Sequence, residues 1–210
     1  MMIHMNEYKY PPLMVKRKNG SEQLKNTDTK EQLIGYWMWA HSDICSNAER
    51  GVFAEYLVSL ALNCADGVRD EWSPYDVHSP EDIKIEVKAS AYIQTWTQKE
   101  LSTIQFSIRP ARAYDYKTNL LEDEVKRQSD VYVFCVENCK DQELVNPLDL
   151  NQWDFYVIAT NKLDRSLGPQ KTITLKSLEK IKPFGAIKCK FSELRKIILN
   201  EYEYQCIPFR

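Results

Sequence analysis

Residues 83–90 read Ile-Lys-Ile-Glu-Val-Lys-Ala-Ser, a segment in which apolar and charged side chains alternate. A period of two is typical of a β-strand that buries one of its faces. Ile85 and Val87 then lie on the buried face, so Glu86 and Lys88 emerge together on the other. The chain must therefore fold around a half-buried strand that fixes a carboxylate beside an ammonium group.

A second carboxylate, Asp76, stands ten positions before Glu86 and follows the turn-forming residues 72–75. Two carboxylates can hold Mg²⁺ through oxygen ligands. A lysine beside them can orient or deprotonate a water and offset developing negative charge. The pattern therefore predicts Asp76, Glu86 and Lys88 as a site for metal-dependent attack on a phosphodiester.

The triplet of an acid, any residue and a lysine is not specific by itself, because it occurs six times in the chain. The spelling Glu-Val-Lys occurs twice, at 86–88 and at 124–126. The sequence around 124–126 is dense in charge and predicts a solvated helix or loop. For 86–88, the alternative is a surface Glu–Lys pair on an exposed sheet face, which contributes little free energy.

Charge is distributed unevenly along a chain whose net charge is only −2. Residues 66–82 hold six acids against one base, whereas residues 170–196 hold eight bases against two acids. An acidic pocket for cations beside a basic surface for phosphates suits a metal-dependent nuclease. The alternative for the basic stretch, which contains Lys188 and Lys190, is that its lysines only solvate exposed surfaces.

Cysteine spacing and hydropathy indicate the compartment. The six cysteines form no C-x-x-C pair and the chain has three histidines, which argues against structural zinc. The longest apolar run, 131–136, is far too short for a membrane span, and residues 1–20 lack the apolar core of a secretory signal. We therefore expect a soluble cytoplasmic protein with reduced thiols and no membrane association.

The pattern along the chain predicts a loosely held N-terminal arm at 1–30 and a single α/β domain at 31–210. In that domain, a central mixed β-sheet is flanked by helices. An aromatic-rich helix is predicted over 31–45, with Trp37 and Trp39 packed in the core.

Ser46 and Glu49 have the spacing of a capping box, which predicts the start of a second helix. Further extended segments and a closing helix are predicted from alternating or continuous apolar runs. The extended segments are 90–97, 104–108, 131–137, 153–160 and 172–175, and the closing helix is 191–199.

With these elements in order, residues 47–94 resemble the PD-(D/E)XK nuclease superfamily, whose fold is restriction-endonuclease-like. The family pattern is an acid on the first helix, an Asp after a turn, and Glu-x-Lys on the next strand. Its matches here are Glu55, Asp76 and Glu86-Val87-Lys88. One departure is Tyr75, where the family pattern has a proline.

The resemblance implies roles for individual residues. Asp76, Glu86 and the backbone carbonyl of Val87 would bind the metal, and Lys88 would position or activate the attacking water. Glu55 would support the metal through a water. Ser90 and Gln94 match the polar residues that follow the motif, and Gln94 would orient Lys88 or a phosphate.

The function that this implies is an Mg²⁺-dependent endonuclease of restriction or repair type, with Mn²⁺ able to substitute. Its substrate would be DNA, with RNA not excluded, and a homodimer would place two active sites on the two strands of a palindrome. The alternative is a catalytically inactive module on the same fold that binds nucleic acid or a partner protein. A small-molecule α/β enzyme is a third reading, but the chain lacks a Gly-rich phosphate loop or a nucleophile motif.

Overall fold

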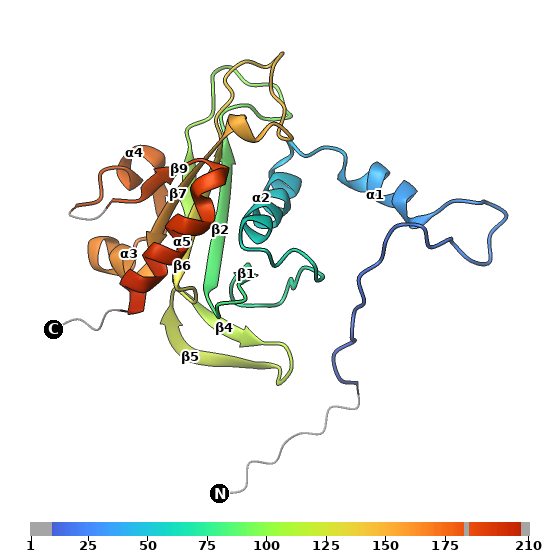
Figure 1. The fold of residues 1–210 in the computed structure, drawn as a ribbon, viewed down its shortest axis with the longest axis horizontal. Coiled ribbons are helices and arrows are strands. Elements are labelled where there is room, and N and C mark those ends of the chain that lie inside the picture. The colour runs from blue at the N-terminus through green and yellow to red at the C-terminus, as the bar shows by residue number, and fades with distance from the viewer. Residues whose placement is uncertain (1–9, 183–184, 207–210) are drawn as a thin grey trace, which may run out of the picture.

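A five-stranded mixed sheet forms the centre of the molecule in the computed structural model, which describes residues 10–182 and 185–206 (Figure 1). Its strand order is β1-β2-β6-β7-β9, in which β2 and β6 are parallel and the other neighbours antiparallel. The strands are β1 (Val77–His78), β2 (Lys84–Ala91), β6 (Val131–Glu137), β7 (Trp153–Ala159) and β9 (Ile187–Cys189). The predicted α/β fold with a mixed sheet flanked by helices is confirmed.

The other elements pack around this sheet or extend from it. The helices are α1 (Leu33–His41), α2 (Asn47–Ala61), the 3₁₀ turn η1 (Leu150–Gln152), α3 (Thr160–Leu167), α4 (Leu175–Leu178) and α5 (Phe191–Cys206). Two further antiparallel pairs join β3 (Gln105–Ser107) to β8 (Thr172–Thr174), and β4 (Ala111–Asp115) to β5 (Leu120–Lys126). Among the described residues, no helix is long and apolar enough to cross a membrane.

The sheet separates two apolar cores. On one face, Ile85 and Val87 of β2 pack with α2 and with Ile198 of α5. On the other face, Tyr132 and Phe134 of β6 pack with β3, β8, α3 and α4. All residues of β6 and β7 are buried, because both faces of these central strands are covered, as their continuous apolar runs predict.

Helix α2 begins where the sequence predicts, but its predicted capping box is only half formed. The Ser46 hydroxyl accepts the Glu49 N–H at 3.4 Å, which satisfies one free donor of the first turn. The Glu49 side chain contacts His41 instead of the Ser46 N–H, which Asp43 satisfies. The cap therefore fixes the start of the helix and also ties it to the end of α1.

Helix α1 departs from the prediction that its tryptophans pack in the core. None of its residues is buried, and Trp39 is 84% exposed. Trp37 packs on Gly20 of the preceding segment, whose φ of 91° and close approach to the ring both require glycine. The helix extends away from the sheet (Figure 1), so its aromatic residues face the arm and the surface rather than the core.

The arm leads into α1 through a short backbone contact, a bridge between Gln23 and Gln32. Most side chains in the described part of the predicted arm, residues 10–30, are exposed. Residues 1–9 of that predicted arm lie outside the described residues.

Residues 111–126 form the β4–β5 hairpin, which the sequence pattern did not reveal. The predicted helix or loop around Glu124 is wrong, because Glu124 lies in strand β5. Every residue of β5 is exposed, so there is no buried face to impose an alternating pattern. The extended segment predicted at 90–97 is strand only as far as Ala91.

Candidate active site

Asp76 is held at the edge of the sheet by backbone contacts to β2. Its N–H donates to the Ile85 carbonyl at 3.0 Å, and its Oδ2 accepts the Val87 N–H at 2.7 Å. The carboxylate thus takes a backbone donor of β2 beside the two-residue strand β1. This contact fixes the carboxylate next to the residue that separates Glu86 from Lys88.

Glu86 and Lys88 lie on the same face of the sheet as Tyr132 and Phe134 of β6. In the parallel pairing, Glu86 is in register with Tyr132 and Lys88 with Phe134. Lys88 Nζ lies 2.6 Å from Glu86 Oε1 and 3.6 Å from Asp76 Oδ2. All three side chains are half-buried. The structure therefore brings Asp76, Glu86 and Lys88 together around one ammonium group.

Burial and the oppositely charged neighbour shift the pKa in opposite directions for both Glu86 and Lys88. Burial raises the pKa of Glu86, and the neighbouring Lys88 only partly offsets the effect. Burial would lower the pKa of Lys88, but Asp76 and Glu86 outweigh it, so the pKa of the ammonium is raised. Lys88 is therefore a cation at neutral pH, held between the acceptor oxygens of two carboxyl groups.

Glu55 lies on α2 and binds Arg69 of the loop that follows that helix. Arg69 donates through Nη2 to Glu55 Oε1 at 3.0 Å and through Nε to the second carboxylate oxygen. Burial raises the pKa of Glu55, whereas the hydrogen bond from Arg69 lowers it. No motif in the sequence marks Arg69 as a site residue, although it is the single base of the acidic stretch 66–82.

A cavity of about 380 Å³ opens beside Asp76. Its wall contains Glu55, Arg69 and the aromatic residues Tyr56 and Tyr75. Glu86 and Lys88 do not line this cavity, although Lys88 Nζ lies 3.6 Å from Asp76 Oδ2. Asp76 thus connects the cavity to the Glu86–Lys88 pair.

The hydrogen bonds of the Gln94 side chain are made to residues other than Asp76, Glu86 and Lys88. Its Nε2 donates to the Ala91 carbonyl at 2.9 Å and to Ser102 Oγ at 3.3 Å, and its Oε1 accepts from the buried Arg50 at 3.2 Å. Within the described chain, these side-chain bonds tie the segment after β2 to the start of α2. Ser90, by contrast, shares the face of β2 that carries Lys88.

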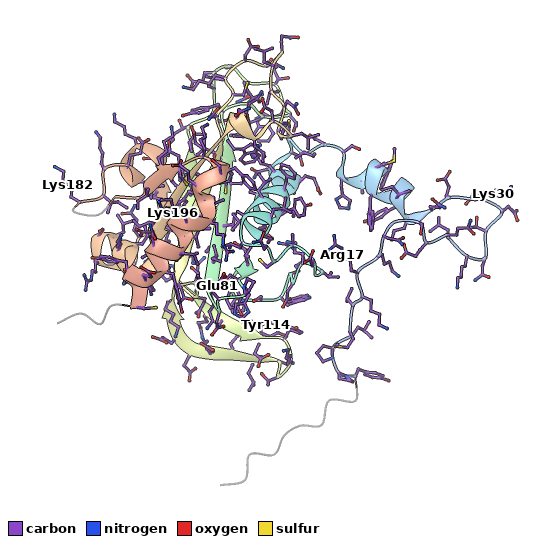
Figure 2. All side chains as sticks on the ribbon, in the orientation of Figure 1. Arg17, Lys30, Glu81, Tyr114, Lys182 and Lys196 are labelled. Atoms are coloured by element: carbon purple, nitrogen blue, oxygen red, sulfur yellow. The ribbon has the colours of Figure 1, made fainter. Side chains whose placement is uncertain are left out.

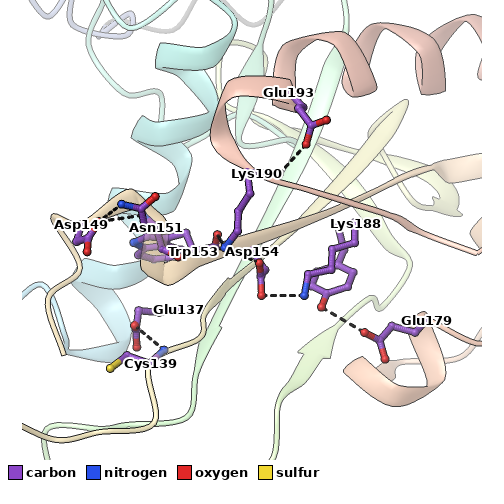
Figure 3. A network of polar contacts seen from close by, with 11 residues as sticks. Glu137, Cys139, Asp149, Asn151, Trp153, Asp154, Glu179, Lys188, Lys190 and Glu193 are labelled. Atoms are coloured by element: carbon purple, nitrogen blue, oxygen red, sulfur yellow. Dashed lines mark hydrogen bonds and ion pairs between the residues drawn. The ribbon is translucent and has the colours of Figure 1, made fainter. Parts of the chain in front are cut away.

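Two lysines of the basic stretch 170–196 form ion pairs far from Asp76. Lys188 and Lys190 contact Asp154 at 3.0 and 2.8 Å (Figure 3). They lie on or next to β9, at the opposite edge of the sheet from Asp76. At about 4.8 Å per strand, β9 lies three spacings from β2. These two lysines therefore do not form a basic surface beside the acidic pocket.

The sequence model of the bacteriophage T4 endonuclease IV family matches residues 2–177. The chain belongs to this family. Comparison with curated proteins gave no match, and comparison with solved structures gave none either. The match to the T4 endonuclease IV family includes β2 and Asp76 but ends before α5. It assigns the chain to a family of nucleases, and the Asp76–Glu86–Lys88 cluster lies within the matched part.

Proposed function

We propose that this member of the T4 endonuclease IV family is an Mg²⁺-dependent endonuclease of the PD-(D/E)XK type that hydrolyses phosphodiester bonds of DNA. One observation carries the proposal: Lys88 Nζ contacts Glu86 at 2.6 Å and Asp76 at 3.6 Å within a chain of a nuclease family. Two carboxylates that converge on one ammonium suit in-line attack on a phosphate, because the carboxylates could also hold a metal ion beside it.

The donor set fits a hard divalent cation. The described residues contain no group of three or more His, Cys, Asp or Glu side chains placed to share a metal ion. A metal would therefore rest on Asp76 and Glu86, a backbone carbonyl and water. Mg²⁺ accepts such a site because it keeps several waters and uses one or two carboxylates. Mn²⁺ favours the same oxygen donors, so it should substitute.

The Val87 carbonyl is the backbone donor that the arrangement favours. The Val87 N–H points at Asp76, since Asp76 Oδ2 accepts it at 2.7 Å. In a strand, the N–H and C=O of one residue point to the same edge. The Val87 carbonyl is therefore expected on the Asp76 side of β2, between the two carboxylates.

In this proposal, the metal would polarise the scissile phosphate and lower the pKa of a bound water. The chain supplies the rest. Glu86, on strand β2, and Asp76, at the edge of the sheet, would bind the metal from fixed positions. Lys88 Nζ, held as an ammonium, donates to the attacking water or to a phosphate oxygen and offsets the charge that develops there. Glu55 faces the same cavity as Asp76, where it can hold a water.

Restriction and repair are the roles we propose for such an enzyme, and double-stranded DNA is the first substrate to test. The experiment incubates supercoiled plasmid with the protein and Mg²⁺, with an excess of chelator in a parallel reaction. Asp76→Asn and Lys88→Ala are compared with Lys126→Ala, which alters the second Glu-Val-Lys triplet. We expect metal-dependent nicking or cutting by the parent and Lys126→Ala, and loss in the other two.

The inactive-module alternative gives a different result in the same experiment. It predicts that the parent binds DNA without cutting it in either Mg²⁺ or Mn²⁺. It also predicts that Asp76→Asn binds DNA at least as tightly as the parent, because the substitution removes a negative charge. Cleavage that survives both Asp76→Asn and Lys88→Ala would place the active site elsewhere in the chain.

A further inference from the structure

Strand β5 presents an exposed edge. Within the described residues it pairs with β4 alone, and all seven of its residues are exposed. Its centre is the acidic run Glu122-Asp123-Glu124, flanked by exposed Leu121 and Val125. An isolated two-stranded hairpin is marginally stable, and an exposed edge strand presents unpaired N–H and C=O groups to which another segment can pair.

The N-terminal arm carries the complementary pattern. Residues 11–19 have no regular structure, and all of them are exposed. They include the basic run Lys16-Arg17-Lys18, preceded by exposed Leu13, Met14 and Val15. A run of three bases beside apolar residues is the counterpart of three acids beside apolar residues.

The two runs match residue by residue. With Arg17 opposite Asp123, Lys16 and Lys18 fall opposite Glu122 and Glu124 in either strand direction, because both runs are three residues long. Opposite charges that face each other across two strands stabilise the pair, whereas like charges destabilise it. Alternation along a strand would place Lys16 and Lys18 on one face and Arg17 on the other.

Arg17 is already engaged with its own chain. Its Nη1 donates to the Ala65 carbonyl at 3.2 Å and lies 3.9 Å from Asp66 Oδ1. Figure 2 shows Arg17 beside the loop that follows α2, whereas Tyr114 marks the hairpin below the sheet. The arm is thus held beside one part of the body, and no described contact joins it to β5 of the same chain. Within the hairpin, Arg112 pairs with Asp123 and Lys126 pairs with Glu124, but these ion pairs are exposed and contribute little free energy.

We propose that residues 13–18 of one copy add as a strand to the β5 edge of a second copy, and that two copies exchange these arms in a two-fold dimer. Lys16 and Lys18 contact Glu122 and Glu124 of the other copy. A two-fold axis forms the contact twice, once for each arm. Pairing of two short strands is a small interface, so the dimer forms in the micromolar range and weakens as salt rises.

The test is sedimentation velocity on the full chain between about 1 and 100 µM. The arm variant is Lys16→Glu with Lys18→Glu, and the hairpin variant is Glu122→Lys with Glu124→Lys. The control is Lys25→Glu with Lys30→Glu, which makes the same two charge changes at exposed positions of the same arm. Thermal unfolding of each variant establishes that it is folded, and Glu122→Gln with Glu124→Gln replaces a hairpin variant that is not.

We expect the parent and the control to dimerise, and each charge-reversed variant to raise the dimer dissociation constant by about tenfold or more. An equimolar mixture of the arm and hairpin variants should dimerise again, because each mixed contact pairs opposite charges. Pairing of an arm with the β5 of its own chain cannot give that rescue.

Three results would overturn the proposal: a monomeric parent at every concentration, an arm variant that dimerises like the parent, or a mixture that stays monomeric. If the arm instead binds nucleic acid, Lys16→Glu with Lys18→Glu leaves the oligomeric state unchanged. It then weakens DNA binding and flattens its salt dependence. That pattern would assign the arm to DNA and reject the dimer.

Discussion

The Asp76 carboxylate accepts the backbone N–H of Val87 at 2.7 Å, the residue that separates Glu86 from Lys88. A side chain from the loop before β1 is thereby bonded to the centre of the Glu-Val-Lys triplet. Asp76 therefore has two proposed roles, as a metal ligand and as a hydrogen-bond acceptor for β2. A substitution at Asp76 can change its charge, its hydrogen bond or both.

Asp76→Asn should abolish Mg²⁺-dependent cleavage and leave the fold intact. An asparagine oxygen can still accept the Val87 N–H, but the ligand loses its negative charge. Asp76→Ala should lose cleavage and also about 1 kcal/mol of unfolding free energy, because the N–H loses its acceptor. Plasmid cleavage and urea unfolding measure the two effects; equal stability of both variants would show that the hydrogen bond contributes nothing.

Lys88→Ala should lower turnover on the order of a hundredfold or more while DNA affinity changes little. The reason is that the ammonium lies between Asp76 and Glu86 and would serve the charge that develops during attack. Single-turnover cleavage and filter binding separate the two quantities. Parallel losses in binding and in cleavage would make Lys88 a phosphate-docking residue.

The pair Glu55–Arg69 offers a test of whether Glu55 acts in the reaction or only holds the loop. If Glu55 supports a water near the metal, Glu55→Gln should lower turnover more than Arg69→Gln does, since the latter leaves the carboxylate in the cavity wall. Turnover at saturating DNA is the measurement. Equal losses would mean that the pair acts only as a structural contact.

Stability in acid should depend on Asp154. Burial raises its pKa, but hydrogen bonds from Lys190 and Lys188 outweigh burial, so the pKa in the folded state is lowered. A lowered folded pKa stabilises the protein above the unfolded value, and this contribution is lost as pH falls through the folded pKa. Asp154→Asn should therefore be less stable by about 1–3 kcal/mol at pH 7.

The difference between parent and Asp154→Asn should shrink once the pH falls below about 4, near the ordinary pKa of an aspartate. Urea unfolding at a series of pH values measures it. A constant difference from pH 3 to pH 7 would show that the ionised carboxylate is not what stabilises this edge of the sheet.

Lys188→Gln with Lys190→Gln should lower stability and leave the salt dependence of DNA binding unchanged. Both lysines bind Asp154, and Lys190 also donates to the Trp153 carbonyl at 2.9 Å. A slope of log affinity against log salt that flattens by about one unit per lysine would instead show phosphate contacts.

The parts of the fold that sequence could predict are those in which one residue pattern corresponds to one environment. The alternation around Glu86 reflects a strand with one buried face, and the continuous apolar run of β6 reflects a strand covered on both faces. Ser46 predicts the start of α2 because an N-cap is a local interaction. The Asp76–Glu86–Lys88 cluster follows from the order of these elements.

The parts that sequence could not predict depend on environments that leave no local pattern. The β4–β5 hairpin is exposed on all of β5, so no periodicity marks it. Trp37 and Trp39 indicate a core position by composition, but α1 extends from the body and packs on Gly20. The Glu55–Arg69 contact joins a helix to a loop, and the charge pattern alone does not specify which acid Arg69 binds.

The parallel pairing of β2 with β6 has a consequence for synthesis of the protein. The β2 strand, which carries Glu86 and Lys88, finishes at Ala91, but its hydrogen-bonded neighbour begins only at Val131. Behind Val87, the core closes with Ile198 of α5, near the end of the chain. Such long-range pairing forms late, because loop closure must precede the contacts that stabilise it. A nascent chain on the ribosome would therefore carry Asp76, Glu86 and Lys88 in unassembled form until α5 has emerged.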